Sequence, residues 1–129
     1  MCARGKWGHS SHPYGENLAL GRGDAEAVDA WFAEYKNIPS SDVNNLAKHF
    51  SSIGHFSQVV WKSTTAVGCD NYVCPNPFVI SGGSPKNKYQ NVAMATCEYS
   101  PAGNVGGMYS FDVPPDMVTS LLQSRQSRP

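Results

Sequence analysis

Two histidines and two glutamates are the residues of this chain best suited to chemistry. His9 and Glu16 lie in one glycine-containing phrase. Glu34 follows two aromatic residues, and His55 lies in an apolar phrase farther along the chain. Imidazole and carboxylate groups bind divalent metals and transfer protons near neutral pH. Because each group sits among apolar residues or glycines instead of in a run of charges, we expect all four side chains to point into a shared pocket.

Three kinds of chemistry are open to this tetrad, by which we mean His9, Glu16, Glu34 and His55 together. The two imidazoles are suited to hold a zinc or copper ion, with the carboxylates orienting them or adding a ligand. Alternatively, the two pairs hold one another in a structural network, or Glu16 or His55 serves as base for a water or for Ser57. The sequence has no Gly-x-Ser-x-Gly elbow and no aspartate phrase to complete a serine triad. Binding or scaffolding is therefore favoured over catalysis.

An amphipathic helix is predicted to carry Glu34. Asp24 is suited to cap its N-terminus, and Pro39 ends it. The apolar residues of this segment recur at the spacing of one helical face, and they are Val28, Trp31, Phe32, Tyr35 and Ile38. Glu34 borders that face, so its carboxylate either lies beside the core or extends to solvent.

The remaining elements are short. A helix is predicted over 55–61, and strands are predicted over 66–74 and 92–99, the last with clear alternation. A final strand is expected over 108–113, whereas residues 15–20 are expected to be loop with at most one helical turn. Helices that flank a small antiparallel sheet make the fold class α+β, in three layers.

The length of 129 residues fits one domain. We expect a domain over 1–113 and a partly disordered tail over 114–129. Ten basic and ten acidic residues cancel, so nucleic acid is not an expected partner. No stretch approaches the roughly 18 apolar residues of a transmembrane segment. The first residues also lack the apolar core of a secretory signal peptide.

The four cysteines favour disulfides over a zinc site. The spacing between Cys69 and Cys74 is wrong for a zinc knuckle, and no second pair accompanies them. Together with Cys2 and Cys97 they permit three pairings. Disulfides form in an oxidising compartment, so a disulfide framework would indicate a secreted protein. The alternative is a short cytosolic product with unpaired, buried thiols.

The segment 75–90 is a second candidate site. Phe78, Val79, Ile80 and Tyr89 place apolar side chains around a pair of glycines in a long loop. An exposed apolar loop suits a hydrophobic ligand, such as a sterol or a fatty-acid-like molecule. The alternative is that these side chains are buried beneath the loop.

Three phrases resemble the CAP superfamily, which comprises cysteine-rich secretory proteins, antigen 5 and pathogenesis-related class 1 proteins. The phrase Gly-His-Phe-Ser-Gln-Val-Val-Trp at 54–61 resembles the first signature of the CAP (SCP) domain. The phrase from Ala95 to Val105 resembles the second signature. The phrase from His9 to Ala19 resembles the fungal and yeast secreted branch.

The resemblance implies an α-β-α sandwich that lacks its first helix in this chain. It implies that the tetrad forms a cavity, with His9 as its first member; the residues alone do not distinguish His9 from His12. It further implies the disulfides Cys2–Cys69 and Cys74–Cys97. Because relatives carry a signal peptide and a helix before the position of Cys2, we expect a secreted full-length parent.

The function we expect is that of a secreted, non-enzymatic CAP-domain protein that binds a sterol or related small lipid, because members of the fungal branch bind and export sterols. The first alternative is a metal-dependent hydrolase or protease that uses the tetrad, with zinc as its cofactor. The second alternative is a structural or protein-interaction module in host–microbe contact, with a partner that the sequence does not name.

Overall fold

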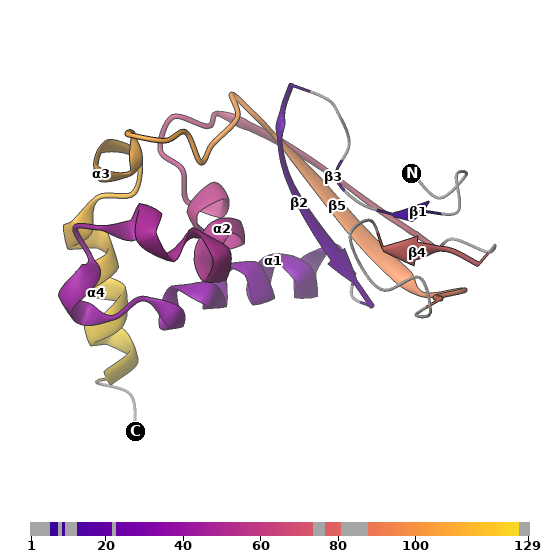
Figure 1. Cartoon of the computed structure of the whole chain (residues 1–129), viewed down its shortest axis with the longest axis horizontal. Helices are drawn as coiled ribbons and strands as arrows, with labels where there is room; N and C mark the ends of the chain where they lie inside the picture. Colours follow the sequence, from indigo (N-terminus) through magenta and orange to yellow (C-terminus); the bar gives the residue numbers. More distant parts are fainter. Residues whose placement is uncertain are drawn as a thin grey trace.

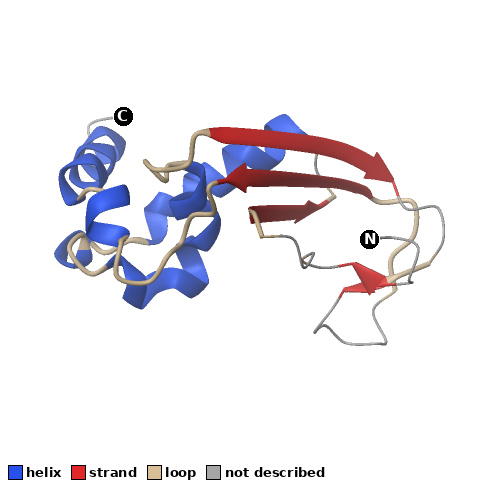
Figure 2. Ribbon diagram, turned by 90° about the horizontal axis from the view of Figure 1, so that it is seen from above, coloured by secondary structure: helices blue, strands red, loops and turns tan. Residues whose placement is uncertain are grey.

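A three-stranded antiparallel sheet forms one end of the molecule, and helices gather at the other (Figure 1). The computed structural model describes residues 6–7, 9, 13–21, 23–73, 77–80 and 88–126. The strands are β2 (Gly15–Leu20), β3 (Ala66–Val73) and β5 (Ala93–Ser100). Their order is β2-β5-β3, so β5 lies in the middle, as Figure 2 shows from above. The predicted α+β class with a small antiparallel sheet is confirmed.

The central strand β5 follows the alternation that its sequence predicts. Ala95, Cys97 and Tyr99 are buried in one cluster with Ala27 and Trp31 of the first helix. The residues between them point to the other face, where Met94 is fully buried. Because successive side chains of a strand point to opposite faces, one strand supplies both apolar layers of the sheet.

The strand β2 corrects the expectation that residues 15–20 are loop. It pairs antiparallel with β5 from Gly15 opposite Tyr99 to Leu20 opposite Met94. The segment has no β-branched residue and a weak alternation of its own, so its local sequence does not favour a strand. The pairing partner, almost eighty residues away, makes it one.

The helical layer begins with α1 (Asp24–Phe32) and continues through three 3₁₀ segments, Ala33–Asn37, Ser40–Asp42 and Leu46–His49, into α2 (Phe50–Val59). The predicted helix over 24–38 therefore tightens to 3₁₀ at Ala33. Helix α2 begins earlier than the predicted 55–61. Figure 1 shows α1 running beneath the sheet, and Trp31 is its main buried contact with β5.

A second apolar cluster fills the helical end. Ile53 and Phe56 of α2 are fully buried there together with Val113 and Val118. The segment predicted as a strand over 108–113 instead contains the short helix α3 (Tyr109–Asp112). The expected tail contains α4 (Pro115–Gln126), and burial of Val118 makes this helix part of the domain core.

The other face of the sheet carries no helix among the described residues. The two short strands β1 (Lys6–Trp7) and β4 (Val79–Ile80) pair in parallel beside it. Phe78 forms an isolated antiparallel bridge with Tyr89 and is buried with Met94. Leu18, Leu20 and Tyr72 pack against these two residues.

A disulfide joins Cys69 to Cys97. The predicted disulfides Cys2–Cys69 and Cys74–Cys97 are therefore wrong. Cys69 lies directly opposite Cys97 on the neighbouring strand, with 4.1 Å between the two Cα atoms. In an antiparallel pair such opposed positions place both side chains on the same face and within bonding reach. Cys2 and Cys74, the predicted partners, lie outside the described residues.

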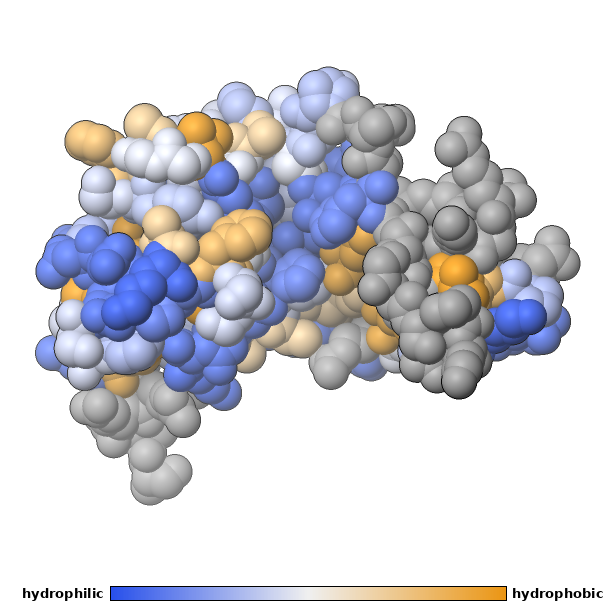
Figure 3. Space-filling model, in the orientation of Figure 1, coloured by the Kyte–Doolittle hydropathy of each residue, from blue (hydrophilic) through white to orange (hydrophobic). Residues whose placement is uncertain are grey.

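The surface combines polar regions with a few exposed apolar side chains. These gather in part around α3, where Val105, Met108 and Phe111 are exposed (Figure 3). Within the part of the chain that the structure describes, no helix has both the length and the apolar character needed to span a bilayer.

The cross-strand disulfide leads to a first prediction. Replacing Cys69→Ala should lower the free energy of unfolding by about 3 kcal/mol, because the unfolded chain regains the freedom of the closed loop. The matched control is Asn71→Ala, an exposed position on the same strand and face. Non-reducing peptide mapping with denaturant unfolding provides the measurement, and a peptide linking Cys69 to Cys2 would contradict the assignment.

Candidate functional site

A cavity of about 210 Å³ lies between β2, α2 and the loop that follows β5. Three members of the tetrad, His9, Glu16 and His55, line it. The other lining residues, which the sequence did not single out as site residues, are Asn17, Phe50, Ser51, Gly54 and Asn104. Glu34 does not line the cavity but contacts His55 from behind.

Glu34 holds His55 through a carboxylate that makes two contacts. One oxygen lies 2.9 Å from His55 Nδ1, and the other accepts the backbone N–H of Phe56 at 2.9 Å. Trp31 stacks on the imidazole, with ring centroids 5.8 Å apart and an angle of 12° between the planes. A ring fixed on one edge and one face has a single orientation, which leaves Nε2 for the cavity.

His9 and Glu16 form a second pair of the same kind. The distance from His9 Nδ1 to Glu16 Oε1 is 2.9 Å. The side chain of Glu16 is only 6% exposed, whereas that of His9 is 65% exposed, so the carboxylate is the fixed member of the pair. His12, the alternative first histidine, lies outside the described residues.

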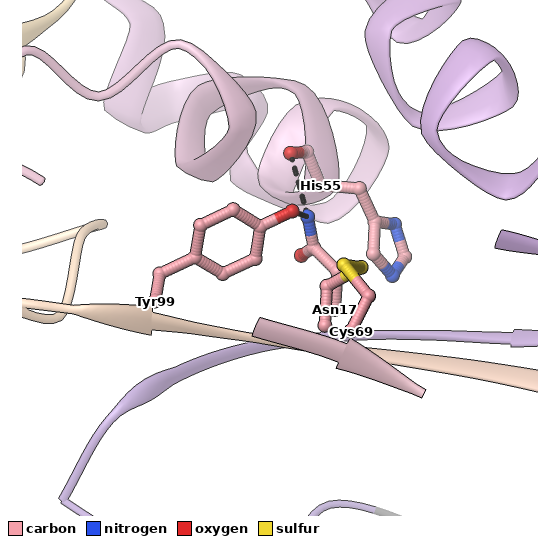
Figure 4. Close-up of a disulfide and its surroundings, with 5 residues drawn as sticks. Asn17, His55, Cys69 and Tyr99 are labelled. Atoms are coloured by element: carbon pink, nitrogen blue, oxygen red, sulfur yellow. Dashed lines mark hydrogen bonds between the residues drawn. A yellow bond between two sulfur atoms is a disulfide. The ribbon is translucent and has the colours of Figure 1, made fainter. Parts of the chain in front are cut away.

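Asn17 ties the cavity to the sheet. Its amide Nδ2 donates to the backbone carbonyl of His55 at 3.1 Å and to the hydroxyl oxygen of Tyr99 at 3.3 Å (Figure 4). Burial raises the pKa of Tyr99, so the phenol stays neutral while it accepts this bond. Asn17 is 2% exposed and follows Glu16 directly. Its adjacency to a candidate site residue was the available sequence signal.

Asn104 closes the cavity from the loop after β5. Its amide Nδ2 donates to the carbonyl of Gly54 at 2.9 Å, and its Oδ1 accepts the hydroxyl of Ser57. Its backbone has φ of 58°, a left-handed conformation that asparagine tolerates better than most residues. Ser57, considered above as a nucleophile, is fully buried and occupied by this bond and by a contact with the Gly54 carbonyl.

Gln58 explains two glycines around the site. Its Oε1 accepts the backbone N–H of Gly103 at 2.8 Å, and its Nε2 donates to Thr64 at 3.1 Å. A Cβ atom at Gly15 would lie 1.9 Å from the same Oε1, and one at Gly103 would lie 2.7 Å from Nε2. A side chain at either glycine would therefore displace the Gln58 amide from these two hydrogen bonds.

The arrangement suits binding through the free edges of two imidazoles. A neutral imidazole that donates through Nδ1 to a carboxylate keeps Nε2 as a lone-pair donor, which is the usual support for a metal-bound histidine. Within the described residues, no group of three or more histidine, cysteine, aspartate or glutamate side chains converges as a metal site. Any metal at this cavity would complete its coordination with water or a ligand.

The predicted lipid-binding residues lie elsewhere, on the sheet face away from α1. Phe78 is 1% exposed and stacks on Tyr89, with ring centroids 5.8 Å apart, so neither belongs to a fully exposed apolar loop. Val79 is half-buried, and Ile80 belongs to β4. Tyr72 joins this cluster to a groove of about 460 Å³, lined by Gly68, Cys69, Asp70, Tyr72, Thr96 and Glu98.

Comparison with known proteins identifies the family. Residues 1–99 match the model described as CAP, the cysteine-rich secretory protein family. The chain belongs to the CAP family. It is 44% identical over 108 residues to Protein PRY2 of Saccharomyces cerevisiae, a match that covers 83% of this chain. It is 39% identical over 107 residues to Pathogenesis-related protein 1B of Nicotiana tabacum, covering 80% of this chain.

A solved structure extends the likeness to three dimensions. The structure of BmVAL-1 superposes with a TM-score of 0.53 at 28% identity and covers 81% of this chain. The CAP chain spans only part of its relatives: 27% of Protein PRY2, 54% of Pathogenesis-related protein 1B and 53% of BmVAL-1.

The double contact of Glu34 leads to a second prediction. Glu34→Ala should lower the free energy of unfolding by about 1–3 kcal/mol, because the N–H of Phe56 and the ring of His55 lose their acceptor. Glu34→Gln should lose less, since one amide oxygen remains. Urea unfolding compares both with Glu26→Ala, an exposed glutamate on α1, where a change under about 0.5 kcal/mol is expected. Equal losses at both positions would contradict the assigned role.

Proposed function

We propose that this CAP chain is a secreted protein that binds a sterol or a related small lipid. The observation that carries the proposal is the apolar cluster of Phe78, Tyr89 and Met94 beside the groove, with Tyr72 shared by both. A volume of about 460 Å³ lies within the range of small-molecule sites. Membership of a family described as secretory supports the compartment.

The groove combines an apolar end with a polar remainder, which suits an amphipathic ligand. Tyr72 provides an aromatic wall at the end next to the apolar cluster. Thr96, Asp70 and Glu98 provide oxygen atoms along the rest of the groove. A sterol is an apolar body with a single hydroxyl, which would lie along the Tyr72 wall and donate its proton to one of these oxygens.

Filling the groove tests the proposal without disturbing the core. An added Cβ at Gly68 meets nothing within 4 Å, so Gly68→Leu should occupy groove space without a clash. We expect this variant to weaken binding of the fluorescent sterol dehydroergosterol at least tenfold, measured by fluorescence titration at low protein concentration. Tyr72→Ala should also weaken it, by removing the aromatic wall.

The matched control is Gly106→Leu, because Gly106 also meets nothing within 4 Å and lies outside the groove. Unchanged sterol affinity in Gly68→Leu, or equal loss in Gly106→Leu, would contradict the groove as the site. We avoid Phe78→Ala as the diagnostic variant, because Phe78 is buried and its truncation would disturb folding as well.

A second candidate function is divalent metal binding at the cavity. The repeated His–Glu geometry favours it, since both imidazoles carry a carboxylate on Nδ1. His9 and His55 would hold the ion through Nε2, while Glu16 and Glu34 keep the rings oriented. A bound zinc ion would supply Lewis acidity to a water or to an anionic ligand group.

Metal binding has its own test. We expect zinc titration calorimetry to show binding that His9→Ala or His55→Ala weakens at least tenfold. The control is His49→Ala, whose ring pairs instead with Asp42 at 2.8 Å and lowers the pKa of that carboxyl through the hydrogen bond. Equal weakening by His49→Ala would contradict the cavity as the site. Retained sterol binding in the tetrad variants would separate the two functions.

A further inference from the structure

The strand β3 is the outermost strand of the sheet. It pairs with β5 along one edge, and no other described strand pairs with it (Figure 2). The strand has eight residues, Ala66–Val73, and all of them except Tyr72 are exposed. Within the described part of the chain the strand is thus open along its outer edge and largely uncovered on both faces, while the disulfide at Cys69 holds it firmly to β5.

The register determines which backbone groups face outward. Cys69 and Cys97 lie opposite each other with Cα atoms 4.1 Å apart, the short spacing of a non-hydrogen-bonded antiparallel pair. At such positions the N–H and C=O groups point away from the neighbouring strand. Because the pattern repeats every second residue, Val67, Asn71 and Val73 share this outward orientation with Cys69.

This edge carries only one of the usual protections against pairing, the single charge of Asp70. The segment Ala66–Val73 contains neither proline nor lysine, and its pairing with β5 runs without a bulge. Two large apolar side chains are exposed on it, Val67 at 59% and Val73 at 52%. An edge with open hydrogen-bonding groups and exposed valines is a template for another strand.

We infer that β3 is a docking edge for β3 of a second copy of this chain, which would pair antiparallel with it into a continuous six-stranded sheet. Outward-facing residues must hydrogen-bond with outward-facing residues, so odd-numbered positions face odd-numbered positions of the second copy. Among such registers, one centred on Asp70 places Val67 opposite Val73 of the second copy, twice by symmetry. The register pairs the two exposed valines with each other.

In the same register, the side chains of the two copies also fit together on the opposite face of the sheet, which carries the even-numbered residues of β3. Gly68 comes to lie opposite Tyr72 of the second copy, where the absent side chain leaves room for the ring. At the two-fold axis, however, Asp70 faces Asp70 of the second copy, and like charges directly opposite weaken a strand pair. The structure therefore assigns a reversible association that this aspartate limits.

Sedimentation equilibrium of the chain over a range of concentrations tests the inference. We expect a monomer–dimer equilibrium that Asp70→Asn tightens several-fold, because the central repulsion is removed. Val67→Lys should weaken the dimer at least tenfold. Combining Val67→Glu with Val73→Lys should restore it, because each glutamate then faces a lysine of the second copy in this register and in no neighbouring one.

The control is Val105→Lys, at an exposed valine outside the sheet, which should leave the equilibrium unchanged. Circular dichroism and thermal unfolding verify that each variant is folded. Monomers at every concentration for both the chain and Asp70→Asn would overturn the proposal. Association that Val67→Lys leaves intact, or that the charge pair fails to restore, would overturn it as well.

Discussion

The antiparallel register of β5 between its two neighbours is the constraint on which the rest of the structure depends. It places Asn17 of β2 opposite Cys97 and two positions from Tyr99, so the amide reaches both that phenol and the carbonyl of His55. It also places Cys69 opposite Cys97 from the other side. A shift by one residue would turn every one of these side chains to the wrong face of the sheet.

The two imidazoles of the cavity are each oriented by a carboxylate, but they are not held equally firmly. His55 is fixed by Trp31 of α1, which provides a stacked indole, and by Glu34 of the following 3₁₀ segment, which provides a carboxylate. Among the described residues, His9 is held by Glu16, and its ring is largely exposed. The two halves of the tetrad therefore differ in rigidity, with His55 the preorganised member and His9 the adaptable one.

Local pattern predicted the elements whose burial is periodic in the sequence. The alternation of β5 and the apolar stripe of α1 follow directly from their residues, because one face of each packs against the other. The strand β2 and the helix α3 could not be predicted in this way. Their conformations are fixed by partners distant in sequence, as when Asp112 accepts the backbone N–H of Ser63.

The site was predictable as a set of residues but not as an arrangement. The histidines and glutamates could be selected from the sequence because their side chains bind metals and transfer protons. The structure places three of the four tetrad residues around one cavity. Glu34 contacts His55 from outside the cavity, whereas Asn17 and Asn104 complete the cavity walls. These roles depend on side-chain directions that only the folded chain defines. The disulfide illustrates the same limit, since a resemblance of cysteine positions does not carry the register that decides which sulfur atoms meet.

The sheet separates three surfaces by elementary strand geometry. The odd-numbered residues of β5 point toward α1 and the cavity, whereas its even-numbered residues Thr96 and Glu98 line the groove. The outward N–H and C=O groups of β3 belong to neither face, because they lie in the plane of the sheet. A ligand in the groove and an ion in the cavity would thus meet different atoms, whereas a strand at the edge would also contact Gly68, Asp70 and Tyr72, which line the groove. The disulfide itself lies on the α1 face, because the side chains of the opposed Cys69 and Cys97 share that face, although Cys69 also borders the groove and lies on the edge strand.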